Sequence, residues 1–411
     1  MHISPNMKIP SSLKFTGKDP SITGLEKQKL LQLLKEKLEK EQKNKYSSDS
    51  LMGKIPNLLI GSYGYPQVNT GFLASNTLKD EDTPSEWVNN KDVGIKEIIL
   101  KRQSLANSKF QTSVNNVTRF SDKLKEVSLS SKSLDAEVYF KGNIKQDLRF
   151  EKDLLPHGPA GELKKLNILE NPKIPFHVQR AESDTDLKAN EAIKILNNKG
   201  INEHFLTKII SAGNLGIKTQ RKIVPTRWAI TTIDDSIGKN YLKMLTHNEN
   251  HEYAFFQGNY LGNHYYVLIF PGPWSFELFE TYVGDIKNAS DYASATDYES
   301  VFGRKTYANN TSGGYYASRL AVLEYLIRKK MRGRILMFRF ITEEYWAPLG
   351  VWVVREASRN AFKGAGISFE NEQDLMNYCF SKALQNFKIN IKPLYRQSKL
   401  LENIQKQQIL L

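Results

Sequence analysis

The stretch EYAFFQGNYLGNHYYVLIFPGPWSFELFETYVG (252–284) decides the fold class. Three strand-like runs rich in aromatic and β-branched residues are separated by LGN (261–263) and PGP (271–273), both short turn sequences, which predicts an antiparallel meander. Helical apolar spacing follows over 313–331, then strand-like runs at 335–341 and 349–356, and a helical pattern at 371–387. Strands in blocks with helices between them predict an α+β protein with a mixed or mainly antiparallel sheet.

The flanking sequence divides the chain into regions. Residues 25–45 (LEKQKLLQLLKEKLEKEQKNK) predict a charged helix, so residues 1–50 form an N-terminal helical arm. Four prolines within 154–180 indicate an extended connection, which separates an N-terminal region (51–180) from a core region (181–391) and a tail (392–411). A helix starting at Ser183 and stopping at Gly200 and a second helix within NEHFLTKIISAG (202–213) are predicted, and this unit (184–213) has the outline of a helix-turn-helix, although an ordinary helical hairpin is more common.

Composition excludes several classes of protein. The 411 residues carry 58 Lys and Arg against 44 Asp and Glu, a formal charge of +14, which favours a polyanionic partner. A single cysteine, Cys379, excludes an internal disulfide framework and a zinc site built from several thiolates. No apolar run is long enough to span a membrane, and the first residues do not resemble a secretory signal. We therefore expect a cytoplasmic protein with no membrane partner.

Two basic stretches contain no acidic residue: GIKTQRKIVPTRW (216–228) and RKKMRGRILMFR (328–339). Arg328 to Lys330 end a predicted helix, where cations complement the helix dipole and need no further role. Among the remaining cations, we predict that Lys218, Arg221, Lys222, Arg227, Arg332 and Arg334 contact DNA phosphates.

Carboxylates supply the candidates for catalysis. Asp234 and Asp235 follow the apolar run WAITTI (228–233), where they could bind a divalent cation or simply form a turn after a strand. Strand alternation places Glu280 on an apolar face, and Arg339 shows the same anomaly, which mutual pairing would explain. An enzyme using Asp234, Asp235 and Glu280 with Mg²⁺ would be a metal-dependent nuclease or another nucleic-acid-processing enzyme. His247 and His251, four residues apart, are interpreted as a solvated loop.

Eight segments in order resemble one family, the archaeal Nre DNA-repair proteins. PTRW-x-I-T-x-x-DD and FPGPW-x-FEL-x-E are the most specific of the shared patterns, and the resemblance covers residues from about 55 to 390. The segments are IGSYGYPQVNTG (60–71), DTPSEW (82–87), HGPAGELKKLNILENPKI (157–174), SDTDLKANEAI (183–193), SAGNLGIKTQRKIVPTRWAITTIDD (211–235), YLGNHYYVLIFPGPWSFELFE (260–280), SGGYYASRLAVLEYL (312–326) and YWAPLGVWVVREASR (345–359). The resemblance implies a role in the response to DNA damage, with DNA, the sliding clamp and other repair proteins as partners. Whether the protein is an enzyme or an adaptor stays open.

The chain departs from the family pattern at both ends. Many members begin with a four-cysteine zinc element, whose cysteine positions are occupied here by Lys14, Gly17, Thr23 and Gln28, so the resemblance implies no structural zinc. Members often end in a clamp-binding peptide: a glutamine, an aliphatic residue three later, then two aromatics. Here Gln397 is followed by Leu400 three residues later, but the two aromatic residues of the motif do not follow. The last three residues of the sequence are Ile409, Leu410 and Leu411. These three are the candidates for clamp binding, with a frayed amphipathic tail as the alternative.

Overall fold

The structure is a computed structural model that describes residues 36, 49–75, 84–90, 92–115, 118–142, 144, 158–246, 248, 250, 252–283 and 294–409. The described chain forms two compact units that divide between Ile237 and Gly238, within helix α8 (Thr226–Met244). We call the described residues from 36 to 237 the barrel unit and the described residues from 238 to 409 the sheet unit.

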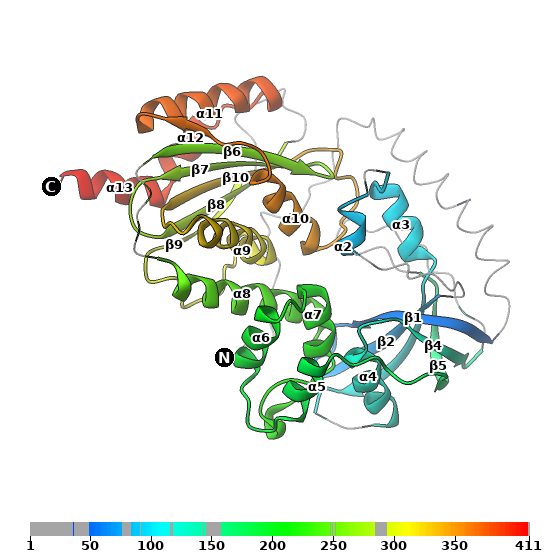
Figure 1. Cartoon of the computed structure of the whole chain (residues 1–411). Helices are drawn as coiled ribbons and strands as arrows, with labels where there is room; N and C mark the ends of the chain where they lie inside the picture. Colours follow the sequence, from blue (N-terminus) through cyan, green and yellow to red (C-terminus); the bar gives the residue numbers. More distant parts are fainter. Residues whose placement is uncertain are drawn as a thin grey trace. The chain divides into compact units, whose positions relative to one another are not determined.

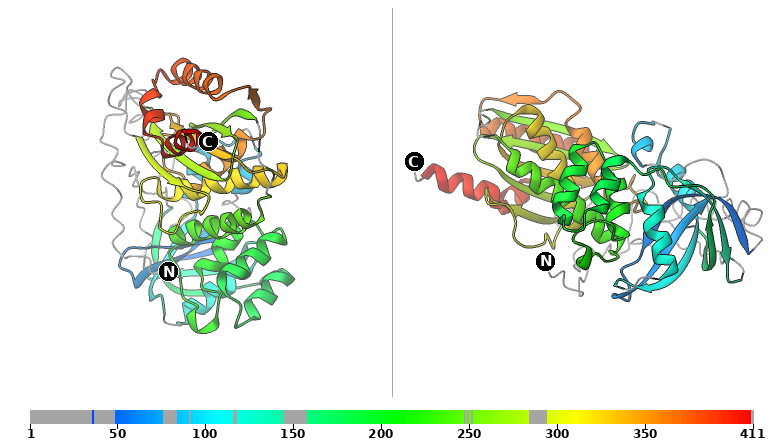
Figure 2. Two further views of the ribbon diagram at one scale, coloured as in Figure 1. Left: turned by 90° about the vertical axis from the view of Figure 1, so that its left-hand side faces the viewer. Right: turned by 60° about the horizontal axis from the view of Figure 1, so that its bottom comes forward.

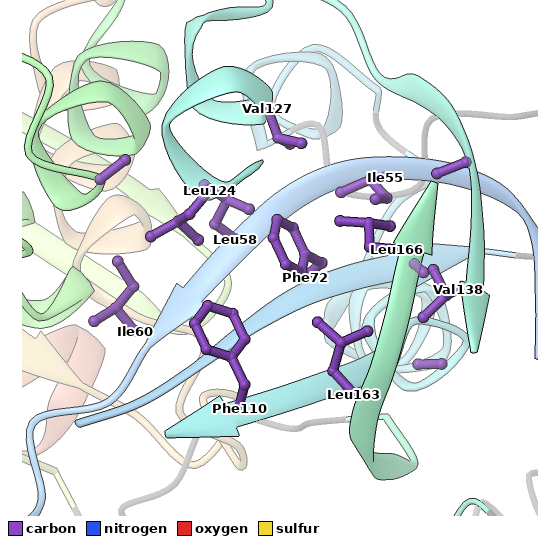
Figure 3. Packing of buried hydrophobic residues seen from close by; sticks show 14 of the residues in the cluster. Ile55, Leu58, Ile60, Phe72, Phe110, Leu124, Val127, Val138, Leu163 and Leu166 are labelled. Carbon is purple, nitrogen blue, oxygen red and sulfur yellow. The ribbon is translucent and has the colours of Figure 1, made fainter. Parts of the chain in front are cut away.

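The barrel unit is built on a closed barrel of five strands (Figure 1). The strands are β1 (Ser50–Ile60), β2 (Gln67–Ser75), β3 (Ala106–Ser113), β4 (Leu134–Phe140) and β5 (Ala160–Ile168), in the order β1-β2-β3-β5-β4. Only β3 and β5 pair in parallel, and β1 closes the barrel by pairing with β4. Alternate side chains point inward, and Phe72, Phe110, Val138 and Leu166 fill the centre (Figure 3).

Glycines allow the barrel to close at its tightest points. Asn107 donates its backbone N–H to the carbonyl of Pro159 at 2.8 Å, which brings the start of β5 against β3. A Cβ on Gly158 would overlap the backbone carbonyl of Leu105, and one on Gly71 would overlap the Asn107 side chain. The segment HGPAGEL (157–163) therefore includes residues that close the barrel, and the close backbone approach explains why glycine stands at 158.

Helices complete the barrel unit. Helix α4 (Arg119–Leu129) connects β3 to β4 and adds Leu124 and Val127 to the barrel core (Figure 3). The other elements are α2 (Pro84–Trp87), α3 (Ile95–Gln103), α5 (Phe176–Ser183), α6 (Ala189–Asn198), α7 (Glu203–Ser211) and the 3₁₀ turn η2 (Lys218–Gln220). Every residue of α7 is buried or half-buried, which favours a packed helical hairpin over a helix that reads a DNA groove.

Two local predictions for this unit were wrong. The helix expected from Ser183 begins at Ala189, because Asp184 accepts the N–H groups of Asp186 and Leu187 in a turn. The run WAITTIDD (228–235) lies within helix α8 and is neither a strand nor the turn after one. Pro225 accepts the N–H groups of Trp228 and Ala229 and so begins the helix despite the β-branched residues.

The sheet unit contains a six-stranded mixed sheet in the order β11-β6-β7-β10-β8-β9. These strands are β6 (Tyr253–Tyr260), β7 (Asn263–Phe270), β8 (Ser275–Tyr282), β9 (Ser294–Glu299), β10 (Arg334–Ile341) and β11 (Ile367–Phe369). The α+β class is confirmed, but the simple meander was wrong. Strand β10 lies between β7 and β8 and runs parallel to β8, so only β6 and β7 form the expected hairpin within 252–284.

Helices cover both faces of this sheet (Figures 1 and 2). Helices α9 (Ser312–Lys329) and α10 (Val351–Ala361) pack on one face, and α11 (Glu372–Phe387), α12 (Lys392–Gln397) and α13 (Lys399–Ile409) pack on the other. The run 349–356 was expected to be a strand and is instead the start of α10, because short apolar runs suit either structure. Among the described residues we find no helix with the length and apolar character needed to cross a membrane.

A buried carboxylate fixes the C-terminal helix to the sheet. Glu277 lies in β8 and accepts hydrogen bonds from the Ser398 hydroxyl at 2.6 Å and from the backbone N–H groups of Lys399 and Leu400. It therefore satisfies donors at the start of α13, as a capping carboxylate does. Burial raises the pKa of Glu277, and these donors act in the opposite direction.

Candidate nucleic-acid interface

The first basic stretch lies on the barrel, and we call residues 216–228 the basic segment. Ile223 is buried in the barrel core and donates its N–H to the carbonyl of Val114 at 3.0 Å, just after β3. Lys218, Lys222 and Arg227 are exposed along the same segment. The apolar anchor thus fixes the backbone while three cations face solvent, an arrangement suited to phosphate contacts.

Arg221 differs from its neighbours because its guanidinium is engaged within the barrel unit. Its Nε donates to the carbonyl of Gly216 at 2.7 Å, and its Nη2 donates to the carbonyls of Glu182 and Asp184, each at 2.8 Å. Its Nη1 also lies 3.4 Å from the Glu182 carboxylate. Arg221 therefore holds the basic segment to the end of α5.

The connection between β1 and β2 presents aromatic side chains, and we call residues 61–66 the aromatic loop. Tyr63 is 91% exposed at its tip. Gly64 has a φ of 80°, a left-handed conformation that favours glycine, and its carbonyl accepts the N–H of Gln67 at 2.9 Å. The loop is thus a tight turn that presents a tyrosine ring to solvent.

The aromatic loop meets the basic segment. The rings of Tyr65 and Trp228 lie 5.1 Å apart between centroids and are inclined at 50°. The end of β1 is tied to the same place, because Ile60 donates its N–H to the Thr226 hydroxyl at 3.0 Å. The aromatic loop and the end of the basic segment, which are about 160 residues apart in the chain, therefore lie side by side in the barrel unit.

The neighbouring strands β2 and β3 offer a polar face. Gln67, Asn69, Lys109 and Gln111 are exposed and alternate with residues of the barrel core. Asn69 lies opposite Gln111 in the strand pairing. Neither strand contains an aspartate or glutamate, so this face supplies hydrogen-bond donors without a carboxylate of its own to repel phosphate.

The other predicted phosphate contacts, Arg332 and Arg334, belong to the sheet unit. Arg332 exchanges backbone hydrogen bonds with Asn248 and Asn250 at 2.8 Å, and Arg334 begins β10. The Arg334 guanidinium passes over Gly272, where a Cβ would lie 2.6 Å from Nε. Both side chains are half-buried.

Glu280 and Arg339 form the ion pair that their places on an apolar face predicted. Arg339 Nη1 lies 2.6 Å from Glu280 Oε1, and Arg339 Nε and Nη2 donate to Asn263 Oδ1 at 3.0 and 2.6 Å. Burial lowers the pKa of Arg339, but the Glu280 carboxylate raises it, and the net direction is upward. Gly314 leaves the room for this pair, because a Cβ there would overlap the Glu280 carboxylate.

The other candidate carboxylates lie in helix α8, where Asp234 is buried and Asp235 is half-buried. Across the part of the chain that the structure describes, no three His, Cys, Asp or Glu side chains are grouped as a metal site would require. Catalysis by Asp234, Asp235 and Glu280 stays a prediction.

Sequence reasoning missed an open pocket of about 820 Å³ in the sheet unit. Phe256, Tyr325 and Phe362 line it, and the last two rings stack at 4.3 Å. Arg359 also lines the pocket and forms ion pairs with Glu324 (Nη2 to Oε1, 2.6 Å) and with Glu356 (Nη1 to Oε1, 2.8 Å). Exposed Arg328, Lys329 and Lys363 also line the pocket, so it combines aromatic and cationic groups. Helical apolar spacing over 313–331 predicted Tyr325 only as part of a helix.

Several predicted positions lie outside the described residues. They include the four positions of the zinc element, Lys14, Gly17, Thr23 and Gln28, together with His247, His251, Leu410 and Leu411. Ile409 is the last residue of α13, and its side chain is not among those described.

Comparison with known proteins identifies the family. The model described as "Archaeal Nre, N-terminal" matches residues 22–285, and "Archaeal Nre, C-terminal" matches residues 299–411. The DNA repair protein NreA of Haloferax volcanii is 35% identical over 333 residues, 77% of this chain and 79% of the relative. The DNA repair proteins NreB and NreA of Archaeoglobus fulgidus are 32% and 33% identical, over 80% and 78% of this chain and 84% and 82% of their own lengths. No solved structure matches the chain. On both the family models and the relatives, the chain belongs to the archaeal Nre family.

Proposed function

We propose that this protein acts in DNA repair and binds DNA through the barrel unit. Three of its relatives carry the name DNA repair protein. The observation that carries the DNA-binding part is the basic segment, which is anchored in the barrel core by Ile223 and leaves Lys218, Lys222 and Arg227 exposed. Arg221 contributes by holding this segment, and Arg332 and Arg334 stay predicted contacts of the sheet unit.

The proposal predicts a specific change in salt dependence. Binding of phosphates releases counterions, so log affinity falls with log salt by about 0.9 for each phosphate neutralised on duplex DNA. We expect the triple variant Lys218→Ala, Lys222→Ala, Arg227→Ala to bind duplex more weakly, with a slope shallower by about 0.9 for each phosphate that it no longer neutralises. Fluorescence anisotropy over a salt series measures both the affinity and the slope.

The matched control removes the same charge elsewhere in the barrel unit. Lys164, Lys194 and Lys199 are exposed and lie outside the basic segment. Their triple alanine variant should keep nearly the wild-type slope. Equal effects in the two triple variants would show that net charge, and not the basic segment, governs binding.

Clamp binding through Ile409, Leu410 and Leu411 is the second part of the proposal, and its support is the family resemblance, because members of the family often carry a clamp-binding peptide. Leu400, Leu401 and Ile404 are buried against the sheet, so a truncation after Lys399 would also damage the fold. The informative truncation ends at Lys406. We expect it to keep the wild-type melting temperature and to lose retention on immobilised sliding clamp. Undiminished retention would exclude these residues.

The metal-dependent nuclease, with Mg²⁺ at Asp234, Asp235 and Glu280, remains the alternative. Glu280 is engaged by Arg339, and Asp234 is buried within α8. No contact observed among the described residues favours this alternative over DNA binding.

A further inference from the structure

We infer that the aromatic loop is a stacking site for the bases of single-stranded DNA, with Tyr63 as its exposed platform. This inference rests on the proposed DNA binding and names the form of DNA that the barrel unit takes. The proposed function assigns only phosphate contacts to the barrel unit, and this inference adds a residue that contacts bases.

The first argument is the placement of Tyr63. Its ring is 91% exposed on a turn held by two backbone hydrogen bonds, from Gly61 to Asn69 at 2.8 Å and from Gln67 to Gly64 at 2.9 Å. A single exposed aromatic is common on protein surfaces, but this one projects from a short, hydrogen-bonded loop. The loop is already ordered by these hydrogen bonds, so it loses little conformational entropy when a base stacks on the ring.

The second argument is the set of aromatic and cationic residues near the aromatic loop. Tyr65, two residues away, lies against Trp228, and Arg227 beside that tryptophan is exposed. Aromatic rings next to cations are the usual means of binding single strands, because the rings stack on bases and the cations contact the backbone. A duplex keeps its base faces stacked on one another, so it cannot use the rings in this way.

The third argument is the barrel itself. A five-stranded barrel in the order β1-β2-β3-β5-β4, with a helix between β3 and β4, has the strand arrangement of the OB folds. Those barrels bind oligonucleotides and oligosaccharides on strands 2 and 3 and on the loop between strands 1 and 2. Here the corresponding places are the face with Gln67, Asn69 and Gln111 and the aromatic loop. This similarity concerns the fold alone. It supports the two arguments from Tyr63 and its neighbouring residues but does not replace them.

The test compares variants of the full chain on labelled oligothymidylate and on a duplex of equal length. Tyr63→Ala should weaken binding to oligothymidylate about tenfold and leave duplex binding unchanged. Tyr63→Phe keeps the ring and should bind like the wild type. Phe302→Ala serves as the control, because Phe302 is 87% exposed in the sheet unit. Melting temperatures confirm that each variant is folded.

The outcomes separate the two proposals. If the basic-segment variant loses binding while Tyr63→Ala binds single strands normally, DNA binding stands and the stacking site is wrong. If Tyr63→Phe loses as much affinity as Tyr63→Ala, the hydroxyl and not the ring binds the strand, which also overturns the inference. If neither form of DNA binds in a salt-dependent way, the proposed function fails and the stacking site fails with it.

Discussion

Replacing Glu280 by alanine should destabilise the sheet unit by about 3–5 kcal/mol, because it leaves the buried Arg339 guanidinium without its carboxylate. The side chains of Glu280 and Arg339 are nearly inaccessible, at 5% and 8% exposure, and after the substitution Arg339 still has the acceptor Asn263 Oδ1 but no longer the carboxylate. The free energy of unfolding, from denaturant titration followed by tryptophan fluorescence, measures the destabilisation.

Two further variants isolate the cause. Removing both charges, with Glu280→Leu and Arg339→Met, should cost much less than the single change, since no unpaired charge remains buried. Glu402→Ala breaks the exposed pair with Lys406, which water and salt screen, and should change stability far less than Glu280→Ala. A single Glu280→Ala variant as stable as Glu402→Ala would contradict the buried pair.

Substitution of Gly158 by alanine should cost about 3 kcal/mol, the upper end of the range for overpacking. The new methyl group would overlap the Leu105 carbonyl, and because the atoms that it meets are backbone, no side chain can turn aside to relieve the overlap. The start of β5 must then move away from β3, which weakens closure of the barrel. Thermal unfolding and hydrogen exchange of the β3 and β5 amides measure the effect.

Gly364 provides the matched control. Among the described residues, no heavy atom beyond Gly364 and its two chain neighbours lies within 4 Å of the position that its Cβ would take, and its backbone does not adopt the left-handed region. Gly364→Ala should therefore change stability by less than about 1 kcal/mol. Equal destabilisation at positions 158 and 364 would show that the close approach to Leu105 does not limit closure.

The periodicity of apolar residues predicted several helices and strands of the sheet unit correctly. Helices α9 and α11 lie where apolar spacing placed them, because each packs on one continuous core. Strand β10 lies where its short apolar run predicted a strand, and its side chains are buried in the cores on both faces of the sheet. Periodicity failed for α8 and α10, whose apolar runs 228–233 and 349–354 fit a strand as well as a helix. The position of β10 between β7 and β8 depends on a parallel pairing between segments about 60 residues apart, and such pairing leaves no local signal.

The candidate site was predicted in part. Acid-free composition identified the basic segment, whereas the residues of the aromatic loop were noted only within IGSYGYPQVNTG (60–71), one of the segments that resemble the family. The signal was present, since GSYGYP (61–66) places two tyrosines between glycines and a proline. The sequence alone did not predict the barrel, because β3 and α4 fall in the Ser- and Asn-rich stretch 103–135, whose apolar periodicity is weak.

Photo-crosslinking of the full chain to a bromodeoxyuridine-substituted single strand tests the central claim most directly. Mass spectrometry of the cross-linked peptides then locates the residues that touch the strand. We predict cross-links in the peptides that contain Tyr63 or Trp228, and the first of these should disappear in Tyr63→Ala. Cross-links confined to residues 238–409, or an equal yield at high salt, would contradict DNA binding by the barrel unit.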